Sequence, residues 1–345
     1  MTENRRIVLG KRPGPKLTLD CFRLESVPRP QVEDGQVLLR VLWLSLDPYM
    51  RGRMNDTPSY AAPVAIGEVM TGGAVCRIVE SRNSEYQPGE LVVATSGWQE
   101  FAVSTGQDLQ RLPAGLAQPS LALGVLGMPG FTAYMGLLDI GKPQRGETVV
   151  VAAATGAVGS VVGQIAKLKG CRAVGIAGGA EKCAWAVEAL GLDACIDHRA
   201  PNCNELLSAA CPKGIDVYFE SVGGMIFNAI VPLLNTHARI PLCGLISQYG
   251  QAAGPSDADS LRTFMRAALV KRLSMRGFII FDDYAAHMPR FLEEMQGWVR
   301  NGWIKYREDV VEGLENAPQA FLGLLEGRNF GKLLVRIAPD DGVAA

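Results

Sequence analysis

Histidine is scarce in this sequence, and the residues that hold zinc in dehydrogenases are not grouped. Only His198, His237 and His287 occur among the 345 residues, and no cluster of cysteine and histidine lies between Cys21 and Cys76. A catalytic zinc site needs three fixed Cys, His or carboxylate ligands and one open position for the substrate. The sequence therefore predicts that neither a catalytic nor a structural metal is bound.

Long apolar runs, paired cysteines and an excess of one charge are also absent. No stretch approaches the length of a membrane-spanning helix, and the N-terminus lacks the apolar core of a secretory signal. The eight cysteines occur singly, without a C-x-x-C pair, which is typical of reduced cytoplasmic thiols. With 34 basic against 35 acidic residues, no broad positive field favours nucleic acid or a membrane surface. We expect a cytoplasmic protein whose partner is a small molecule.

The hydrophobic pattern changes along the chain and predicts about two domains. From Gly35 to about Val103, short β-branched and apolar runs are separated by glycine, proline and asparagine, which indicates mostly β-structure. From Thr148 to about Gly277, short apolar strands alternate with helical periodicity, which indicates βαβ units and a parallel sheet. A helix at 317–325 and a strand at 332–337 follow, and that late strand could rejoin the first domain. We predict an α/β protein in which a doubly wound domain interrupts a β-rich one.

A strand, a glycine turn and a helix follow one another near the middle of the chain. The apolar run 148–152 leads into Ala154-Thr155-Gly156-Ala157-Val158-Gly159-Ser160, and a helix is expected over 160–168. A dinucleotide site needs small residues here because the pyrophosphate approaches backbone N–H groups at the helix N-terminus. The first glycine of the usual pattern is Ala154, so the match is partial. The alternative is an ordinary turn whose small residues only permit close packing of helix and sheet.

The next turn distinguishes the two nicotinamide cofactors. An NAD site offers a carboxylate to the ribose about 20 residues after the glycines. Here the strand 173–177 is followed by Gly178-Gly179-Ala180, and Lys182 comes soon after. A cation in this turn suits the extra phosphate of NADPH, although the negative charge of Glu181 argues mildly against a phosphate site here. Lys182 could otherwise be an ordinary exposed helix lysine.

The predicted absence of a metal limits which reactions the protein could catalyse. Without a Lewis acid, reduction of a simple carbonyl lacks its usual means of stabilising oxyanion charge. Hydride addition to the β carbon of an enone gives an enolate, whose charge tyrosine hydroxyls, backbone N–H groups or the cofactor ribose can hold. The sequence therefore favours an NADPH-dependent reductase of activated alkenes.

Three motifs resemble the zinc-free medium-chain dehydrogenase/reductase family, in its leukotriene B4 12-hydroxydehydrogenase or prostaglandin reductase branch. They are Leu46-Asp47-Pro48-Tyr49-Met50-Arg51, Gly127-Met128-Pro129-Gly130-Phe131-Thr132-Ala133-Tyr134, and the glycine turn from Ala152 to Gln164. Within the branch, Ser45 to Met54 and Gly136 to Ile140 are similar to bacterial NADPH-dependent curcumin reductases. The resemblance covers nearly the whole chain.

The resemblance implies a fold, a cofactor and an assembly. It implies a GroES-like β-rich substrate and catalytic domain at 1–126, to which 303–345 return, and a Rossmann NADPH-binding domain at 127–302. It implies NADPH-dependent reduction of the C=C bond of α,β-unsaturated ketones, such as curcumin-like enones and alkenones, and of alkenals. A homodimer is what the family suggests.

The resemblance also implies which residues bind the cofactor. The segment 155–159 would hold the pyrophosphate, and Lys182 and His198 would approach the 2′-phosphate, although the family usually has tyrosine where His198 stands. Ser221, in a motif that usually carries asparagine, and the loop 243–249 would lie beside the nicotinamide. The full expected set is Thr155, Gly156, Ala157, Val158, Gly159, Lys182, His198, Ser221, Cys243, Gly244, Ile246, Tyr249, Phe278, Ile279, Ile280 and Asn329.

Several of these residues have simpler explanations. The apolar residues 278–280 would be core strand in any α/β protein, Cys243 is better explained as a packed small residue than as a nucleophile, and Asn329 could cap its glycine-rich turn.

The expected proton donor is a tyrosine, because its hydroxyl is a donor near neutral pH. Tyr60, Tyr249 and Tyr284 are the candidates, and each could equally be a wall residue. Two other functions stay open. One is an NADPH-dependent quinone reductase, separable by turnover of enones and quinones side by side. The other is a non-catalytic NADPH-binding structural protein, which would bind cofactor without turnover.

Overall fold

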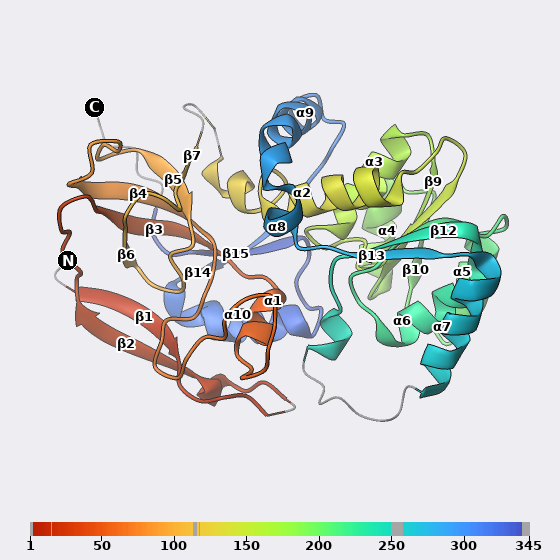
Figure 1. Ribbon diagram of the computed structural model, residues 1–345, viewed down its shortest axis with the longest axis horizontal. Coiled ribbons are helices and arrows are strands. Elements are labelled where there is room, and N and C mark those ends of the chain that lie inside the picture. Colours follow the sequence, from red (N-terminus) through yellow and green to blue (C-terminus); the bar gives the residue numbers. More distant parts are fainter. Residues whose placement is uncertain (1–2, 15, 113–115, 117, 250–257, 340–345) are drawn as a thin grey trace. The chain divides into compact units, whose positions relative to one another are not determined.

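The structure is a computed structural model that describes residues 3–14, 16–112, 116, 118–249 and 258–339 (Figure 1). Contacts within the chain divide it into two units. The first unit takes in residues 1–123, 308–329 and 333–345, and the second takes in residues 124–307 and 330–332. Both ends of the chain therefore contribute to the first unit.

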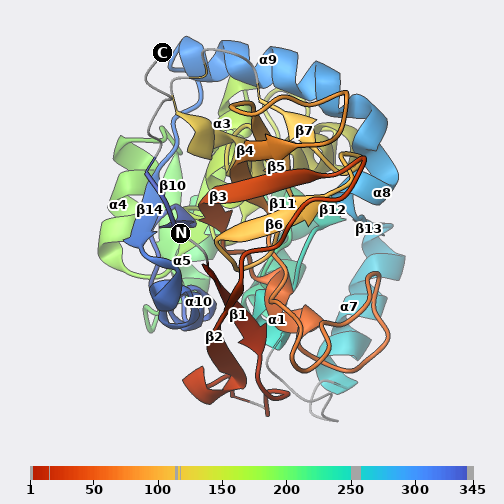
Figure 2. The ribbon, with the colours of Figure 1, turned by 90° about the vertical axis from the view of Figure 1, so that its left-hand side faces the viewer.

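The first unit is mostly antiparallel β-structure. Its larger sheet has the strand order β14-β15-β3-β4-β5-β7, with β6 also paired to β3, and β1 and β2 form a separate pair. Figure 2 shows β3, β4, β5 and β6 side by side. The strands are β1 Glu3–Leu9, β2 Phe22–Pro28, β3 Val37–Ser45, β4 Ala74–Ser81, β5 Leu91–Ala94, β6 Phe101–Ser104, β7 Gln110–Arg111, β14 Glu308–Glu312 and β15 Lys332–Arg336. Two α-helices accompany them, α1 Tyr49–Arg53 and α10 Ala317–Leu325.

The apolar residues of β3 and an aromatic cluster make the core of this unit. Eight of the nine β3 residues are buried, which fits a central strand covered on both faces. Trp98 stacks on Phe22 with ring centroids 5.5 Å apart and meets Phe321 of α10 edge to face at 5.6 Å. The late strand β15 pairs antiparallel with β3, with Leu334 opposite Ser45. The C-terminal segment thus becomes part of the sheet made by the N-terminal residues.

The second unit is a six-stranded parallel sheet in the order β10-β9-β8-β11-β12-β13. Its strands are β8 Thr148–Val151, β9 Arg172–Ala177, β10 Ala194–Asp197, β11 Ile215–Phe219, β12 Leu234–Leu242 and β13 Ser274–Gly277. Its helices are α2 Met128–Met135, α3 Gly159–Leu168, α4 Ala180–Glu188, α5 Cys203–Ala210, α6 Gly224–Ile230, α7 Ala258–Lys271, α8 Ile280–Tyr284 and α9 Met288–Arg300.

Helices cover both faces of this sheet, since α2 and α3 lie on one side and α5, α6 and α7 on the other (Figure 1). Leu207 of α5 and Ile230 of α6 pack in one core with Val150 and Tyr218 of the sheet. The four residues of β8 are all buried, as expected for a strand covered on both faces. The predicted fold class, a β-rich unit plus a doubly wound parallel unit, is confirmed.

Among the residues that the structure describes, no helix combines the length and the apolar character needed to cross a membrane.

Candidate cofactor and active site

The carboxyl ends of the six parallel strands lie along one edge of the second unit's sheet. From β8 the chain winds outward to β9 and β10, and from β11 it winds the other way to β12 and β13. Open α/β sheets bind ligands at this edge, where the direction of winding reverses. The switch lies between β8 and β11. Most residues expected to bind the cofactor follow the carboxyl ends of these strands.

The glycine turn joins β8 to α3. The N–H of Gly156 donates to Ala153 O at 2.9 Å, and that of Ser160 donates to Gly156 O at 3.1 Å. A Cβ on Gly159 would lie 2.3 Å from Ala153 O, so the helix can start this close to the strand only with glycine there. At Gly156 a Cβ would lie 3.2 Å from the same oxygen. The fold therefore requires Gly159 more strictly than Gly156.

A segment distant in the sequence lies beside this turn. Gly331 forms a parallel bridge with Gly156, and the neighbouring ring of Phe330 meets Trp185 of α4 edge to face at 5.1 Å. Gly331 has φ +93°, and a Cβ there would lie 2.2 Å from Arg307 O. No local motif signals this contact, so the sequence analysis did not include residues 330–332 in this region.

Basic side chains gather at the ends of β9 and β10. A Cβ on Gly178 would lie 2.9 Å from His198 Nε2 and 3.1 Å from Arg199 Nη2. Lys182 lies in α4, with its Nζ 5.9 Å from the ring centroid of Phe330. The structure thus brings Lys182 and His198 to the turn where the sequence analysis expected them. Arg199, which that analysis missed, lies beside them.

Asp197 organises this turn. Its Oδ1 accepts from the N–H of Gly179 at 2.9 Å and from that of Arg199 at 3.0 Å. These backbone hydrogen bonds lower the pKa of Asp197. Burial lowers the pKa of His198, and the positive charge of Arg199 lowers it further. A carboxylate is thus present, but it is bound to the backbone.

A buried glutamate shapes the loop after β11. Glu220 is 1% exposed, and its Oε1 accepts from the N–H of Val222 at 2.6 Å and of Gly223 at 2.9 Å. Burial raises the pKa of Glu220, and the two backbone donors oppose that rise. Ser221 donates from its hydroxyl to Ala152 O at 3.3 Å, which ties this loop to the end of β8. Glu220 is a structural residue of the site to which the sequence analysis assigned no role.

The loop after β12 is joined to the same segment by backbone hydrogen bonds. The N–H of Cys243 donates to Glu220 O at 3.0 Å, that of Ile246 to Ser221 O at 3.2 Å, and that of Ser247 to Val222 O at 3.1 Å. Gly244 lies in this loop, where a Cβ would come 3.1 Å from the hydroxyl oxygen of Tyr249. The structure therefore brings the expected residues at 221 and 243–249 together.

Two side chains of this loop have identifiable environments. Burial raises the pKa of Cys243 to about 12, which makes the thiol a poor nucleophile and favours its interpretation as a packing residue. The hydroxyl of Tyr249 accepts from the N–H of Leu245 at 3.2 Å.

Phe278 and Ile279 lie between β13 and α8, and Ile280 is the first residue of α8, so the run 278–280 is not a strand. Phe278 packs against Gly136, where a Cβ would lie 2.7 Å from its ring, and it meets Tyr284 edge to face at 6.1 Å. The hydroxyl of Tyr284 donates to Asp139 Oδ2 at 2.7 Å. Burial raises the pKa of Tyr284 to about 12, and the Asp139 carboxylate adds to the rise.

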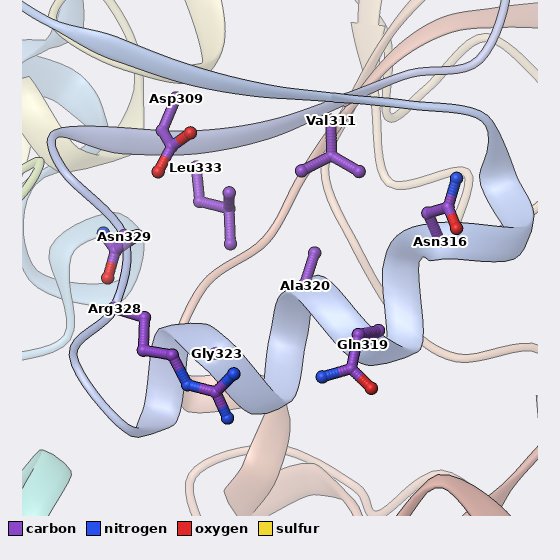
Figure 3. A pocket seen from close by; sticks show the side chains of 9 residues that line it. All are labelled: Asp309, Val311, Asn316, Gln319, Ala320, Gly323, Arg328, Asn329 and Leu333. Atoms are coloured by element: carbon purple, nitrogen blue, oxygen red, sulfur yellow. The ribbon is translucent and has the colours of Figure 1, made fainter.

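Two expected residues belong to the first unit. Tyr60 is 56% exposed in the loop after α1, and it is one cause of the raised pKa of Tyr49, after burial and the Asp47 charge. Asn329 lines a pocket of about 340 Å³ beside β14 and α10, where Figure 3 also shows Arg328 and Asp309.

No group of three or more His, Cys, Asp or Glu side chains within the described ranges is arranged to hold a metal ion.

Known families match both parts of the chain. A family described as the N-terminal domain of oxidoreductase matches residues 5–112, and one described as zinc-binding dehydrogenase matches residues 157–296. NADPH-dependent curcumin reductase of Escherichia coli K12 is 57% identical over 338 residues, which cover 98% of this chain and 98% of that protein. Prostaglandin reductase 1 of Bos taurus is 42% identical over 319 residues, which cover 91% and 93% of the two chains.

A solved structure shows the same similarity in three dimensions. The crystal structure of CurA from Vibrio vulnificus in complex with NADPH superposes with a TM-score of 0.93 at 55% identity, covering 97% of this chain and 99% of that one. The likeness therefore extends through the β-rich unit and the parallel-sheet unit alike.

Proposed function

Because this chain belongs to the medium-chain dehydrogenase/reductase family, we propose that it uses NADPH to reduce the C=C bond of α,β-unsaturated ketones. The observation that carries the proposal is the 57% identity to a curcumin reductase over 98% of both chains. The basic cluster and glycine turn at one sheet edge support it. The substrates are curcumin-like enones, alkenals and alkenones.

The residues at the sheet edge fit NADPH chemically. Segment 155–159 offers small residues and backbone N–H groups to the pyrophosphate, and Lys182, His198 and Arg199 offer positive charge or N–H donors to the 2′-phosphate. Ser221 and the loop residues Cys243, Gly244, Ile246 and Tyr249 would hold the nicotinamide end of the cofactor. Phe278, Ile279 and Ile280 would complete this part of the cofactor site. Asn329 of the first unit is proposed as a cofactor-binding residue from the family resemblance alone. The family resemblance assigns residues 127–302 to the NADPH domain and 1–126 with 303–345 to the substrate domain, whereas the second unit of the structure takes in 124–307 and 330–332.

Bound NADPH supplies the hydride that adds to the β carbon of the enone. The protein must then hold the negative charge on the former carbonyl oxygen and allow a proton to reach the α carbon. Tyr249 and Tyr284 are candidates for the donor to that oxygen, and the Tyr284 hydroxyl donates to Asp139 in this structure. Tyr60 is the third candidate, from the loop after α1.

The test follows NADPH absorbance with purified protein and three acceptors, which are curcumin, an alkyl enone and a quinone, with NADH as the control donor. Rapid NADPH oxidation with the enones and formation of the saturated ketone are the expected results. Turnover confined to the quinone would identify a quinone reductase. Tight NADPH binding without any turnover would identify a binding or structural protein.

We also propose a homodimer, formed through the outer edge of β13 and the adjoining helix α7. β13 is the last strand in its sheet, and all four of its residues are exposed. Leu261, Met265 and Leu269 recur at four-residue spacing on α7 and are 62%, 60% and 80% exposed. An edge strand pairing antiparallel with its own copy is self-complementary about a two-fold axis, and flanking apolar helices would then bury each other.

Light scattering tests the assembly. Leu269→Lys should shift the mass from dimer to monomer, whereas Met225→Lys, a matched control at an 89% exposed methionine on α6, should not. A monomeric wild type, or a dimer that survives the α7 change, would contradict this interface.

We also propose that the protein is cytoplasmic. All eight cysteines lie in described segments and are free thiols, as is usual in the reducing cytoplasm.

A further inference from the structure

The basic cluster after β9 and β10 contains one group that titrates near neutral pH. His198 Nε2 and Arg199 Nη2 lie 2.9 and 3.1 Å from the position of a Cβ on Gly178, so both side chains lie over the Gly178-Gly179 turn after β9. Lys182 lies close enough for its charge to act on His198. NAD-specific enzymes place a carboxylate in this turn for the ribose 2′-hydroxyl. Here the turn carries hydrogen-bond donors and positively charged side chains.

The charges that face His198 determine its state before cofactor binds. Burial lowers the pKa of His198 below its ordinary value, the charges of Arg199 and Lys182 lower it further, and Asp197 opposes them. These effects together favour the neutral imidazole in the free protein. A neutral His198 adds no charge to that of Lys182, Arg199 and Asp197.

We propose that His198 takes up a proton when NADPH binds and serves, beside Lys182 and Arg199, as a titrating ligand of the 2′-phosphate. A phosphate monoester carries close to two negative charges above about pH 6, so it stabilises a cation beside it. A protonated imidazole supplies such a charge and a charge-assisted hydrogen bond. Arg199 supplies the permanent charge that selects NADPH over NADH. The inference rests on the proposed function, because NADPH must be the cofactor.

The direction of the pH dependence follows from the charge gained. An anionic partner raises the pKa of His198 in the complex above its value in the free protein. The contribution of His198 to binding is therefore complete below the pKa of the free protein and is lost as pH rises through the pKa of the complex. Within that window the NADPH affinity should fall by up to about tenfold per pH unit. NADH, which has no 2′-phosphate, should not show this slope.

Calorimetric titration of the full-length protein with NADPH tests the proposal without any turnover. The same titration is run slightly above pH 7 in two buffers of different ionisation enthalpy, because the phosphate itself is then already a dianion. The wild type should show a buffer-dependent enthalpy that corresponds to uptake of a fraction of a proton, up to about one, per NADPH. His198→Gln, which keeps an N–H donor but does not titrate, should abolish the uptake and flatten the pH slope of the NADPH dissociation constant.

Controls separate this effect from a general loss of binding. His237→Asn changes a histidine at a distant part of β12 and keeps a residue that tolerates its φ of +66°, so proton uptake should persist. Arg199→Gln should weaken the binding of NADPH about tenfold or more without changing the binding of NADH. Arg199→Lys should restore part of the lost NADPH affinity. Tight NADPH binding without proton uptake in the wild type, or uptake unchanged in a folded His198→Gln variant, would overturn the inference and leave the reductase proposal intact. No NADPH binding at all would instead defeat the proposed function.

Discussion

A matched pair of glycine substitutions would separate the folding role of the glycine turn from its role in cofactor binding. The same methyl group is added at Gly156 and at Gly159. At Gly159 it would lie 2.3 Å from Ala153 O and 3.0 Å from Ala152 O, and both are backbone atoms that move only with the chain. At Gly156 the nearest atom is Ala153 O at 3.2 Å, and φ is not in the left-handed region. The two variants should therefore differ in stability although the chemical change is identical.

The size of the difference follows from the geometry. Forcing a methyl group into such a contact costs about 2 to 3 kcal/mol of unfolding free energy, less a few tenths regained by replacing glycine in a helical turn. For a unit of this size that cost lowers the melting temperature by roughly 5 to 10 °C. Gly156→Ala should melt within a degree or two of the wild type. Gly156→Val should also fold, but its larger side chain should obstruct the pyrophosphate.

The assays are thermal unfolding followed by circular dichroism and NADPH titration followed by fluorescence. Each charge-assisted hydrogen bond lost to the pyrophosphate should cost about 1.5 to 3 kcal/mol, which is roughly a 10- to 150-fold rise in the NADPH dissociation constant of Gly156→Val. In that variant NADPH should also fail to raise the melting temperature. Normal NADPH affinity in Gly156→Val, or a Gly159→Ala variant as stable as Gly156→Ala, would refute this reasoning.

Two further sites give measurable predictions. Glu220→Ala should lower both stability and NADPH affinity, because two backbone N–H groups lose a buried acceptor at about 1 to 3 kcal/mol, and Glu220→Gln should rescue part of both losses. Melting curves and NADPH titration check this, and an alanine variant identical to the wild type would contradict it. Tyr249→Phe should lower kcat for enones with little change in NADPH affinity, whereas Tyr284→Phe should chiefly lower the melting temperature, by leaving the Asp139 carboxylate without its tyrosine donor. Steady-state kinetics beside melting curves separate the two, and the reverse pattern would make Tyr284 the better candidate for the donor.

Most of the fold and the family could be predicted from the sequence because the signals are local. The strand at 148–151, the helix at 159–168 and the strand at 172–177 lie within a residue or two of their predicted bounds. A run of apolar residues and a glycine turn specify these elements with little help from distant residues. The family resemblance, built on three motifs, is confirmed by relatives that match nearly the whole chain.

The exception lies at 278–280, which would be core strand by apolar character alone. There the strand β13 ends at Gly277, and α8 begins at Ile280. Phe278 fills the space left by Gly136, a residue far away in the sequence. The short apolar run could not distinguish a strand from a packed turn, because periodicity cannot be measured over three residues.

The sequence by itself determined the alternation of strands and helices and the glycine turn, since each depends on neighbouring residues. Only the tertiary structure decided which distant groups meet. It placed His198 and Arg199 over Gly178, set Gly331 against Gly156, and joined the loop after β12 to the backbone of Glu220 and Ser221. These contacts depend on strand order and on the path of the returning C-terminal segment, and linear spacing does not encode either one.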